Sequence, residues 1–321
     1  MPDSKSISFL PKPILLTKEI DYYKLDLENI MNQNYQKIKQ QIKLKSFISG
    51  ISSDEVSLAK SLVDNKCKNK NLFICEGLWA TEKLIEKKFK ITHFFFNNDR
   101  LENDQLTQQD LEKIAKLVNI SQKSFAISEK ACKKISDRDG YDEFFIVAEV
   151  QTFSFEDIEQ LIEKKDNVLA IVMDGLEQPG NIGAILRSFD CAGGDFAIVV
   201  NKQARLGHSR LVRSSLGASF MIPVIETDIE SAQKWLLKNN FKNVVTDLQA
   251  KKNYREIDYS GRISIIAGNE HTGISSSWRE QKNSESIIIP MLGSCESLNV
   301  GFASTLVSYE AGLQKFKNIK Y

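Results

Sequence analysis

AGNEHTGIS (Ala267–Ser275) and IPMLGSCESLNVG (Ile289–Gly301) are two glycine-bearing segments in the last third of the chain, each directly after a short β-prone run. A third segment, DGLEQPGNIGAILR (Asp174–Arg187), follows the strand-like residues Val168–Met173. Glycines at strand ends let the backbone approach a ligand where a Cβ atom would clash. Three such strand ends in one region predict a small molecule held largely by backbone groups.

From residue 168 onward, strand-like and helix-like runs alternate, which is typical of an α/β domain with a mostly parallel sheet. The predicted strands are Val168–Met173, Phe196–Val200, Phe220–Val224, Asn243–Asp247, Ile263–Ile266 and Ser286–Ile289, and the predicted helices are Ile182–Cys191, Ser209–Leu216, Ser231–Asn239 and Val300–Lys317.

The first half of the chain predicts a smaller α/β unit over residues 51–152, and residues 153–167, which are charged and helical in period, form the linker to residues 168–321. Residues 1–50 form an N-terminal extension in which Leu25–Ile48 has the period of an amphipathic helix. Its lysines indicate either an RNA-contacting arm or a solvated face. Within the smaller unit we expect helices at Val56–Val63, Leu78–Lys87 and Leu106–Val118, and strands at Leu72–Glu76, Ile91–Phe96 and Phe144–Val150.

The composition is that of an ordinary soluble protein of 321 residues with a formal net charge of +1. No apolar run approaches the roughly 20 residues that span a membrane, and the N-terminus lacks the pattern of a signal peptide, so we expect a cytoplasmic location. The five cysteines are scattered and the three histidines have no metal-ligand spacing. Neither a disulfide framework nor a metal site is expected.

Charge is distributed unevenly around residue 200. No acidic residue lies between Asp195 and Glu226, a stretch that also contains His208. This pattern suits either a patch that binds phosphates or a solvated helix face, and charge alone does not separate the two. The cations in question are Lys202, Arg205, Arg210 and Arg213.

The segment Gly180–Gly183 opens a helix after a strand, where a helix N-terminus can hold an anion. Its GxxG spacing lacks the second glycine of the GxGxxG dinucleotide fingerprint, so a nicotinamide-dependent oxidoreductase is disfavoured. Arg187 is placed to bind a phosphate bidentately or to be a surface arginine, and Glu270 and Asn299 are either functional or turn-forming residues.

Together the three segments resemble the three motifs of the SpoU-type RNA 2′-O-ribose methyltransferases, within the SPOUT superfamily of trefoil-knot enzymes. The motifs appear in the family's order as DGLEQPGNIGAILRS, IAGNEHTGIS and IPMLGSCESLNVGFA, and cover roughly residues 168 to 315. Gly301 stands where a serine is usual in the third motif.

The first half resembles the substrate-recognition domain that many such enzymes carry, a small ribosomal-protein-like α/β fold. The resemblance rests on Ile74–Lys87 (ICEGLWATEKLIEK) and on Ile127–Val150. The segment Arg210–Val224 is most similar to the ribosomal-RNA branch, which includes the thiostrepton-resistance enzymes. Leu216 departs from the arginine that the resistance enzymes carry before the glycine.

The resemblance implies a cofactor, S-adenosyl-L-methionine, bound in a knotted C-terminal region, and methyl transfer to a ribose 2′-hydroxyl. It implies ribosomal RNA in preference to transfer RNA, and a homodimer; a non-catalytic RNA-binding relative is the alternative of a different class. RNA phosphates would be contacted by Lys202, Arg205, Arg210 and Arg213. Cofactor contacts carry over to Thr246, Gly268, Ile289 and Leu298, and catalytic roles to Arg187, Asn181, Glu270, Ser297 and Asn299, with Arg187 acting on the substrate phosphate and hydroxyl.

Overall fold

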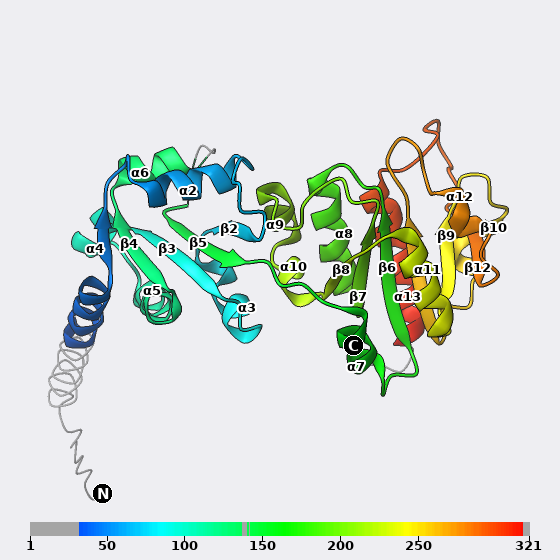
Figure 1. The fold of residues 1–321 in the computed structure, drawn as a ribbon, viewed down its shortest axis with the longest axis horizontal. Coiled ribbons are helices and arrows are strands. Elements are labelled where there is room, and N and C mark those ends of the chain that lie inside the picture. Colours follow the sequence, from blue (N-terminus) through cyan, green and yellow to red (C-terminus); the bar gives the residue numbers. More distant parts are fainter. Residues whose placement is uncertain (1–31, 137–139, 141, 317–321) are drawn as a thin grey trace, which may run out of the picture.

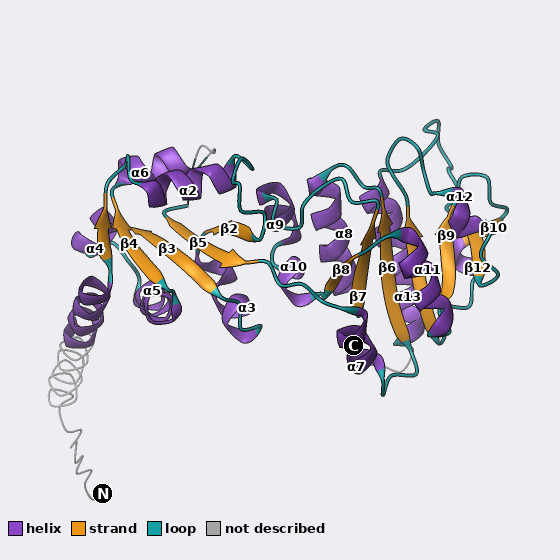
Figure 2. Cartoon of the chain, viewed as in Figure 1, coloured by secondary structure: helices purple, strands orange, loops and turns teal. Residues whose placement is uncertain are grey.

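The protein is seen here in a computed structural model, which describes residues 32–136, 140 and 142–316. Two β-sheets lie at the two ends of an elongated molecule, each covered by helices (Figure 1; Figure 2). Residues 1–31 of the predicted N-terminal extension lie outside the described residues. Among the residues described, no helix has both the length and the apolar character needed to cross a membrane.

The first sheet has five strands in the order β1-β4-β3-β5-β2. Strands β1, β4 and β3 are mutually parallel, whereas β5 runs antiparallel to both of its neighbours. Its elements are β1 (Phe47–Ser49), α2 (Asp54–Val63), β2 (Leu72–Glu76), η1 (Leu78–Ala80), α3 (Thr81–Glu86), β3 (Ile91–Asn97), α4 (Asn98–Glu102), α5 (Gln108–Ile120), β4 (Lys123–Ile127), α6 (Glu129–Ile135) and β5 (Phe144–Glu149).

The second sheet has seven strands in the order β10-β12-β9-β11-β6-β7-β8, and all of its pairings are parallel. Helix α7 (Phe155–Ile162) leads into it. The remaining elements are β6 (Val168–Asp174), α8 (Pro179–Cys191), β7 (Phe196–Val200), α9 (Ser209–Ser215), α10 (Ala218–Met221), β8 (Val224–Glu226), α11 (Ile229–Lys238), β9 (Lys242–Thr246), β10 (Lys252–Asn253), η2 (Tyr254–Glu256), β11 (Arg262–Ala267), α12 (Ser276–Arg279), β12 (Ser284–Ile288) and α13 (Val300–Lys315).

The parallel sheet is buried on both faces, so its central strands are continuously apolar. Alternate residues of β6 enter different cores: Ile171 packs with side chains of α8 and α13, whereas Val172 packs with side chains of α7 and α11. This three-layer arrangement confirms the predicted α/β fold with a mostly parallel sheet. It also brings the carboxyl ends of β6, β11 and β12 to one edge, where the glycine-bearing segments lie.

One predicted element is wrong, and another ends at the wrong residue. Phe220–Val224 is not a strand: Gly217, at φ 89°, starts the short helix α10, and β8 begins only at Val224. Phe220 leaves the sheet pattern because its ring packs against Phe73 of the first unit, with centroids 5.1 Å apart. The predicted helix Leu25–Ile48 ends early, since residues 32–45 are helical but Phe47–Ser49 pairs with β4.

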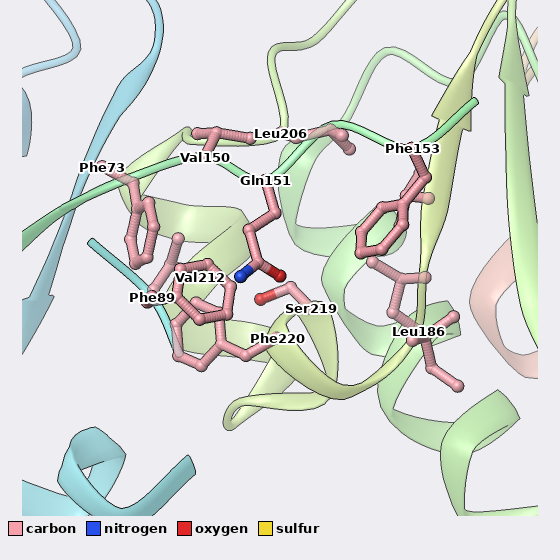
Figure 3. Close-up of a pocket in the computed structure, with 12 residues that line it drawn as sticks. Phe73, Phe89, Val150, Gln151, Phe153, Leu186, Leu206, Val212, Ser219 and Phe220 are labelled. Atoms are coloured by element: carbon pink, nitrogen blue, oxygen red, sulfur yellow. The ribbon is translucent and has the colours of Figure 1, made fainter. Parts of the chain in front are cut away.

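The two units meet at α9 and α10. Arg213 donates to the buried carboxylate of Glu76 over 2.7 Å, and Asn65 donates to the Ser209 hydroxyl over 3.0 Å. A cavity of about 30 Å³ lies beside this junction, and in it the side chain of Gln151 points toward Ser219 (Figure 3). Among the described residues, none of the predicted catalytic or cofactor residues lines this cavity.

Candidate active site

The segments Asp174–Arg187 and Ala267–Ser275 lie side by side because β6 and β11 are parallel neighbours. Met173 is paired with Ala267 at the carboxyl ends of the two strands. The chain that leaves β6 therefore turns into α8 next to the loop that leaves β11. This arrangement places Asn181 and Glu270 within contact distance.

Glu270 is the centre of the site. Its carboxylate accepts a hydrogen bond of 2.8 Å from the Asn181 amide and bonds of 3.2 and 3.4 Å from the backbone N–H groups of Glu177 and Gln178. Partial burial acts to raise the pKa of Glu270, but these hydrogen bonds outweigh it and hold the pKa below its ordinary value. The helix N-terminus that the sequence offers to an anion is therefore occupied by the protein's own carboxylate.

The segment Ile289–Gly301 joins the same network through Asn299. Its amide donates to the Asn181 side-chain oxygen over 3.2 Å, and its own oxygen accepts from the Gly301 N–H, which caps α13. Asn181 is thus both donor and acceptor between Glu270 and Asn299. Three residues predicted from three separate segments form one chain of hydrogen bonds.

Two further residues support these loops and were missed in the sequence. Asn269 donates to the Gly175 carbonyl over 2.7 Å and accepts from the N–H groups of His271 and Thr272. The buried carboxylate of Asp174 accepts from the Ser275 N–H over 3.0 Å. Both could have been found from the sequence, because each is an Asn or Asp at or just beyond the carboxyl end of a strand.

Arg187 lies on α8, one turn beyond the contact with α9. Its side chain is exposed and makes no hydrogen bond or ion pair with any residue that the structure describes. The guanidinium is thus available to an external anion, whereas Asn181, Glu270 and Asn299 are engaged with one another.

The predicted cofactor residues surround the ends of β9, β11 and β12. Thr246 donates its hydroxyl to the Ile266 carbonyl over 3.0 Å, so this side chain is committed within the sheet. A Cβ on Gly268 would lie 2.5 Å from the Gly273 carbonyl carbon, which requires glycine for the loop's own close packing. Ile289 packs partly into the core, while Ser297 and Leu298 are exposed.

The loop that bears the third motif has unused backbone groups. Within the described part of the chain, no N–H or C=O group of residues 290–298 takes part in a hydrogen bond. Residues 292–298 are exposed, so their main-chain groups are open to solvent or to a ligand. The loop therefore fits the requirement of a ligand that is read by main-chain donors and acceptors.

The four predicted RNA-contacting cations differ in their surroundings. Lys202 pairs with Glu226 over 2.5 Å, Arg213 pairs with Glu76, and Arg205 donates to the Leu72 carbonyl over 3.1 Å. Only Arg210 of the four is exposed without a partner among the described residues. In the folded protein this stretch does have an acidic neighbour, because Glu76 of the first unit contacts Arg213.

Comparison with known proteins gives a consistent result. Residues 168–309 match the model of the SpoU rRNA Methylase family. The chain is 32% identical over 139 residues to the 23S rRNA (guanosine(2553)-2′-O)-methyltransferase RlmP of Bacillus subtilis, an alignment that covers 43% of this chain and 56% of that protein. It is 33% identical over 170 residues to the 23S rRNA (guanosine-2′-O-)-methyltransferase RlmB of Coxiella burnetii, covering 52% of this chain and 67% of that protein.

The fold is shared with a solved structure over most of both chains. The crystal structure of an AdoMet-bound rRNA methyltransferase from Sinorhizobium meliloti superposes with a TM-score of 0.71, at 23% identity, and covers 82% of this chain and 97% of that chain. This likeness extends over both sheets and shows the architecture.

Proposed function

This chain belongs to the SpoU rRNA methylase family, and we propose that it transfers a methyl group from S-adenosyl-L-methionine to a ribose 2′-hydroxyl of ribosomal RNA. The single observation that carries the proposal is the hydrogen-bonded chain Glu270–Asn181–Asn299, which joins the three motif segments beside an unpaired Arg187. Ribosomal RNA is favoured over transfer RNA by the names of the relatives RlmP and RlmB. We place the reaction in the cytoplasm, where such RNA is found.

S-adenosyl-L-methionine, when bound, supplies the methyl group. We assign its contacts to the backbone around Gly268, Ile289 and Leu298, with the unused main-chain groups of residues 290–298 as the supporting observation. Thr246 would contact the cofactor through its main chain, because its hydroxyl already donates to the Ile266 carbonyl. In the knot that we propose, the chain after β12 passes through the preceding loops before α13 returns to pack on α8 and β11.

A ribose hydroxyl is a poor nucleophile that needs alignment and help in losing its proton. Arginine stays protonated, so Arg187 acts by binding the adjacent phosphate and stabilising charge on the 2′-oxygen rather than as a base. Glu270 and Asn181 hold the start of α8 and so position Arg187 two turns along the helix. Ser297 and Asn299 line the same edge.

We propose that the unit around the first sheet, residues 51–152, selects the RNA, with the short segment 153–167 as the linker. It resembles the ribosomal-protein-like recognition domain of related enzymes. Arg210 is the cation of the α9 region with a free side chain for a phosphate, and Lys202, Arg205 and Arg213 contribute positive potential while paired within the protein.

A homodimer is part of the proposal and rests on α13. Phe302, Leu306, Tyr309 and Leu313 form an exposed apolar stripe at helical spacing on this helix, of which Phe302 is 69% exposed. Such a stripe on an otherwise packed helix is typical of an interface. In the proposed dimer, a second copy of this chain packs against the stripe and removes it from solvent.

The test is methyl transfer from isotopically labelled S-adenosyl-L-methionine to purified ribosomal RNA and, separately, to transfer RNA. Label in the ribose of ribosomal RNA is expected, and Arg187→Ala should abolish it while leaving cofactor affinity within about twofold of wild type. Wild-type turnover by that variant would refute the assignment of Arg187, and label confined to transfer RNA would refute the substrate. An inert wild type that still binds RNA would favour the non-catalytic alternative.

A further inference from the structure

We propose that a hollow between the two units, bordered by Trp79 and Leu216, holds one unstacked nucleobase of the RNA. The hollow has a volume of about 240 Å³ and is lined from both units. The first unit contributes Ile74, Glu76, Trp79 and Asp142, and the second contributes Ser209, Val212, Arg213 and Leu216. It is smaller than the pockets that take drug-sized ligands, and suits a flat group. This inference rests on the proposed RNA substrate and names a site for part of it.

Trp79 provides a fixed aromatic surface. The residue is 38% exposed, yet the ring N–H donates to the Glu76 carbonyl over 2.7 Å and the ring stacks on Phe220 at an interplanar angle of 14°. The other two tryptophans, Trp235 and Trp278, are buried. An exposed ring that is already held in place loses little entropy when a base stacks on it, and base–aromatic stacking is how proteins bind splayed RNA nucleotides.

The opposite wall carries backbone strain. Leu216 has φ 45° and ψ 37°, a left-handed conformation that is uncommon for a residue with a Cβ atom, and its side chain remains largely exposed. Its carbonyl accepts from the Lys83 ammonium over 3.0 Å, and a Cβ on Gly217 would approach Trp79 to 3.1 Å. The two units thus fix this strained turn against the indole, as is found at ligand-binding sites.

The polar lining suits the edge of a base. The Arg213 guanidinium, which is paired with the buried Glu76 carboxylate over 2.7 Å, is the donor at the hollow, whereas Glu76 and the Ser209 hydroxyl are engaged by other groups of the protein. Nucleobases carry complementary donors and acceptors on their edges.

Exposed cations from both units lie near Ser209. The Ser209 hydroxyl is held by Asn65, so the loop after α2 adjoins the hollow, and this loop carries the exposed Lys66, Lys68 and Lys70. Arg210, which follows Ser209, is exposed as well. These charges suit the phosphates that flank an inserted base.

The test is a fluorescence titration of the full chain with a short single-stranded RNA that contains all four bases. Because Trp79 is the exposed tryptophan, we expect quenching on binding, and an oligomer with the same ribose–phosphate backbone but no bases should bind without quenching. Trp79→Phe should abolish the quenching yet keep affinity within about twofold, whereas Trp79→Ala should weaken RNA binding at least about fivefold.

A second variant tests the hollow independently, in case Trp79→Ala does not fold. Leu216→Glu places a carboxylate at the mouth of the hollow and should weaken RNA binding at least about fivefold, while the matched exposed change Leu237→Glu on α11 should not. Failure of the wild type to bind the base-bearing RNA, or binding without quenching, would overturn the proposal. Neither readout needs methyl transfer, so loss of the proposed activity would be seen separately, in the labelling assay.

Discussion

The amide of Asn181 donates to the carboxylate of Glu270 over 2.8 Å, joining residues 89 positions apart. This bond connects the start of α8 to the loop after β11. Because Glu270 also accepts two backbone N–H groups at the helix start, it acts as the cap that α8 lacks in its own sequence, where Gln178 makes no side-chain cap bond.

Replacing Glu270 with alanine should therefore reduce both stability and activity. Loss of a carboxylate that accepts three hydrogen bonds is expected to lower the free energy of unfolding by about 1–3 kcal/mol. Methyl transfer should fall at least about tenfold through kcat, because Arg187 lies on the helix whose start is released. Urea unfolding and single-turnover labelling measure the two effects. An unchanged kcat with reduced stability would make Glu270 a purely structural cap.

Stability should also depend on pH through Glu270. Its folded-state pKa is depressed, so its contribution is present above the ordinary carboxyl pKa of about 4.3 and is lost as pH falls through the lower folded-state value. Glu270→Gln should flatten that part of the stability curve relative to wild type. Unfolding free energies compared below pH about 5 test the sign, and a steeper curve for the variant would contradict it.

The close packing around Gly183 leads to a prediction about stability, for which Gly180 on the same helix provides the control. A Cβ there would lie 2.0 Å from the Ser214 hydroxyl and 2.5 Å from the Leu211 carbonyl oxygen, because α8 and α9 are in close contact. Gly183→Ala should cost about 1–3 kcal/mol of stability despite the better helix propensity of alanine. Gly180→Ala on the same helix meets nothing within 4 Å and should be neutral or stabilising by up to about 1 kcal/mol. Thermal unfolding of the two variants compares them directly, and equal melting temperatures would refute the close contact.

Much of the parallel sheet could be predicted from sequence because its strands are apolar runs buried on both faces, as in Val168–Met173 and Phe196–Val200. The family was also predicted correctly from the three motifs. Strand β4 was missed because Lys123 and Ser124 interrupt its apolar pattern, and its position depends on neighbours β1 and β3. The helix at Phe220 depends on aromatic partners in the other unit, which no local pattern contains.

The candidate site, like the fold, could be predicted only in part from the sequence. Asn181, Glu270 and Asn299 could be named from their motifs, but their contact follows from strand order and was not visible along the chain. The basic stretch was harder, because the acid that neutralises Arg213 is Glu76, in a different unit. Local charge counts therefore overestimate how many of these cations are free for RNA.

The apolar stripe on α13 leads to a prediction about assembly. Phe302 and Leu306 are exposed one turn apart, and a glutamate at either position would bury a charge in a two-fold interface, which is strongly unfavourable. Phe302→Glu should convert the proposed dimer to a monomer at micromolar concentration, as measured by sedimentation equilibrium. Leu237→Glu, on α11 at 50% exposure, is the matched control and should remain dimeric. A wild type that sediments as a monomer, or a Phe302→Glu variant that stays dimeric, would remove α13 as the interface, and activity of the monomeric variant would show that each site is complete within one chain.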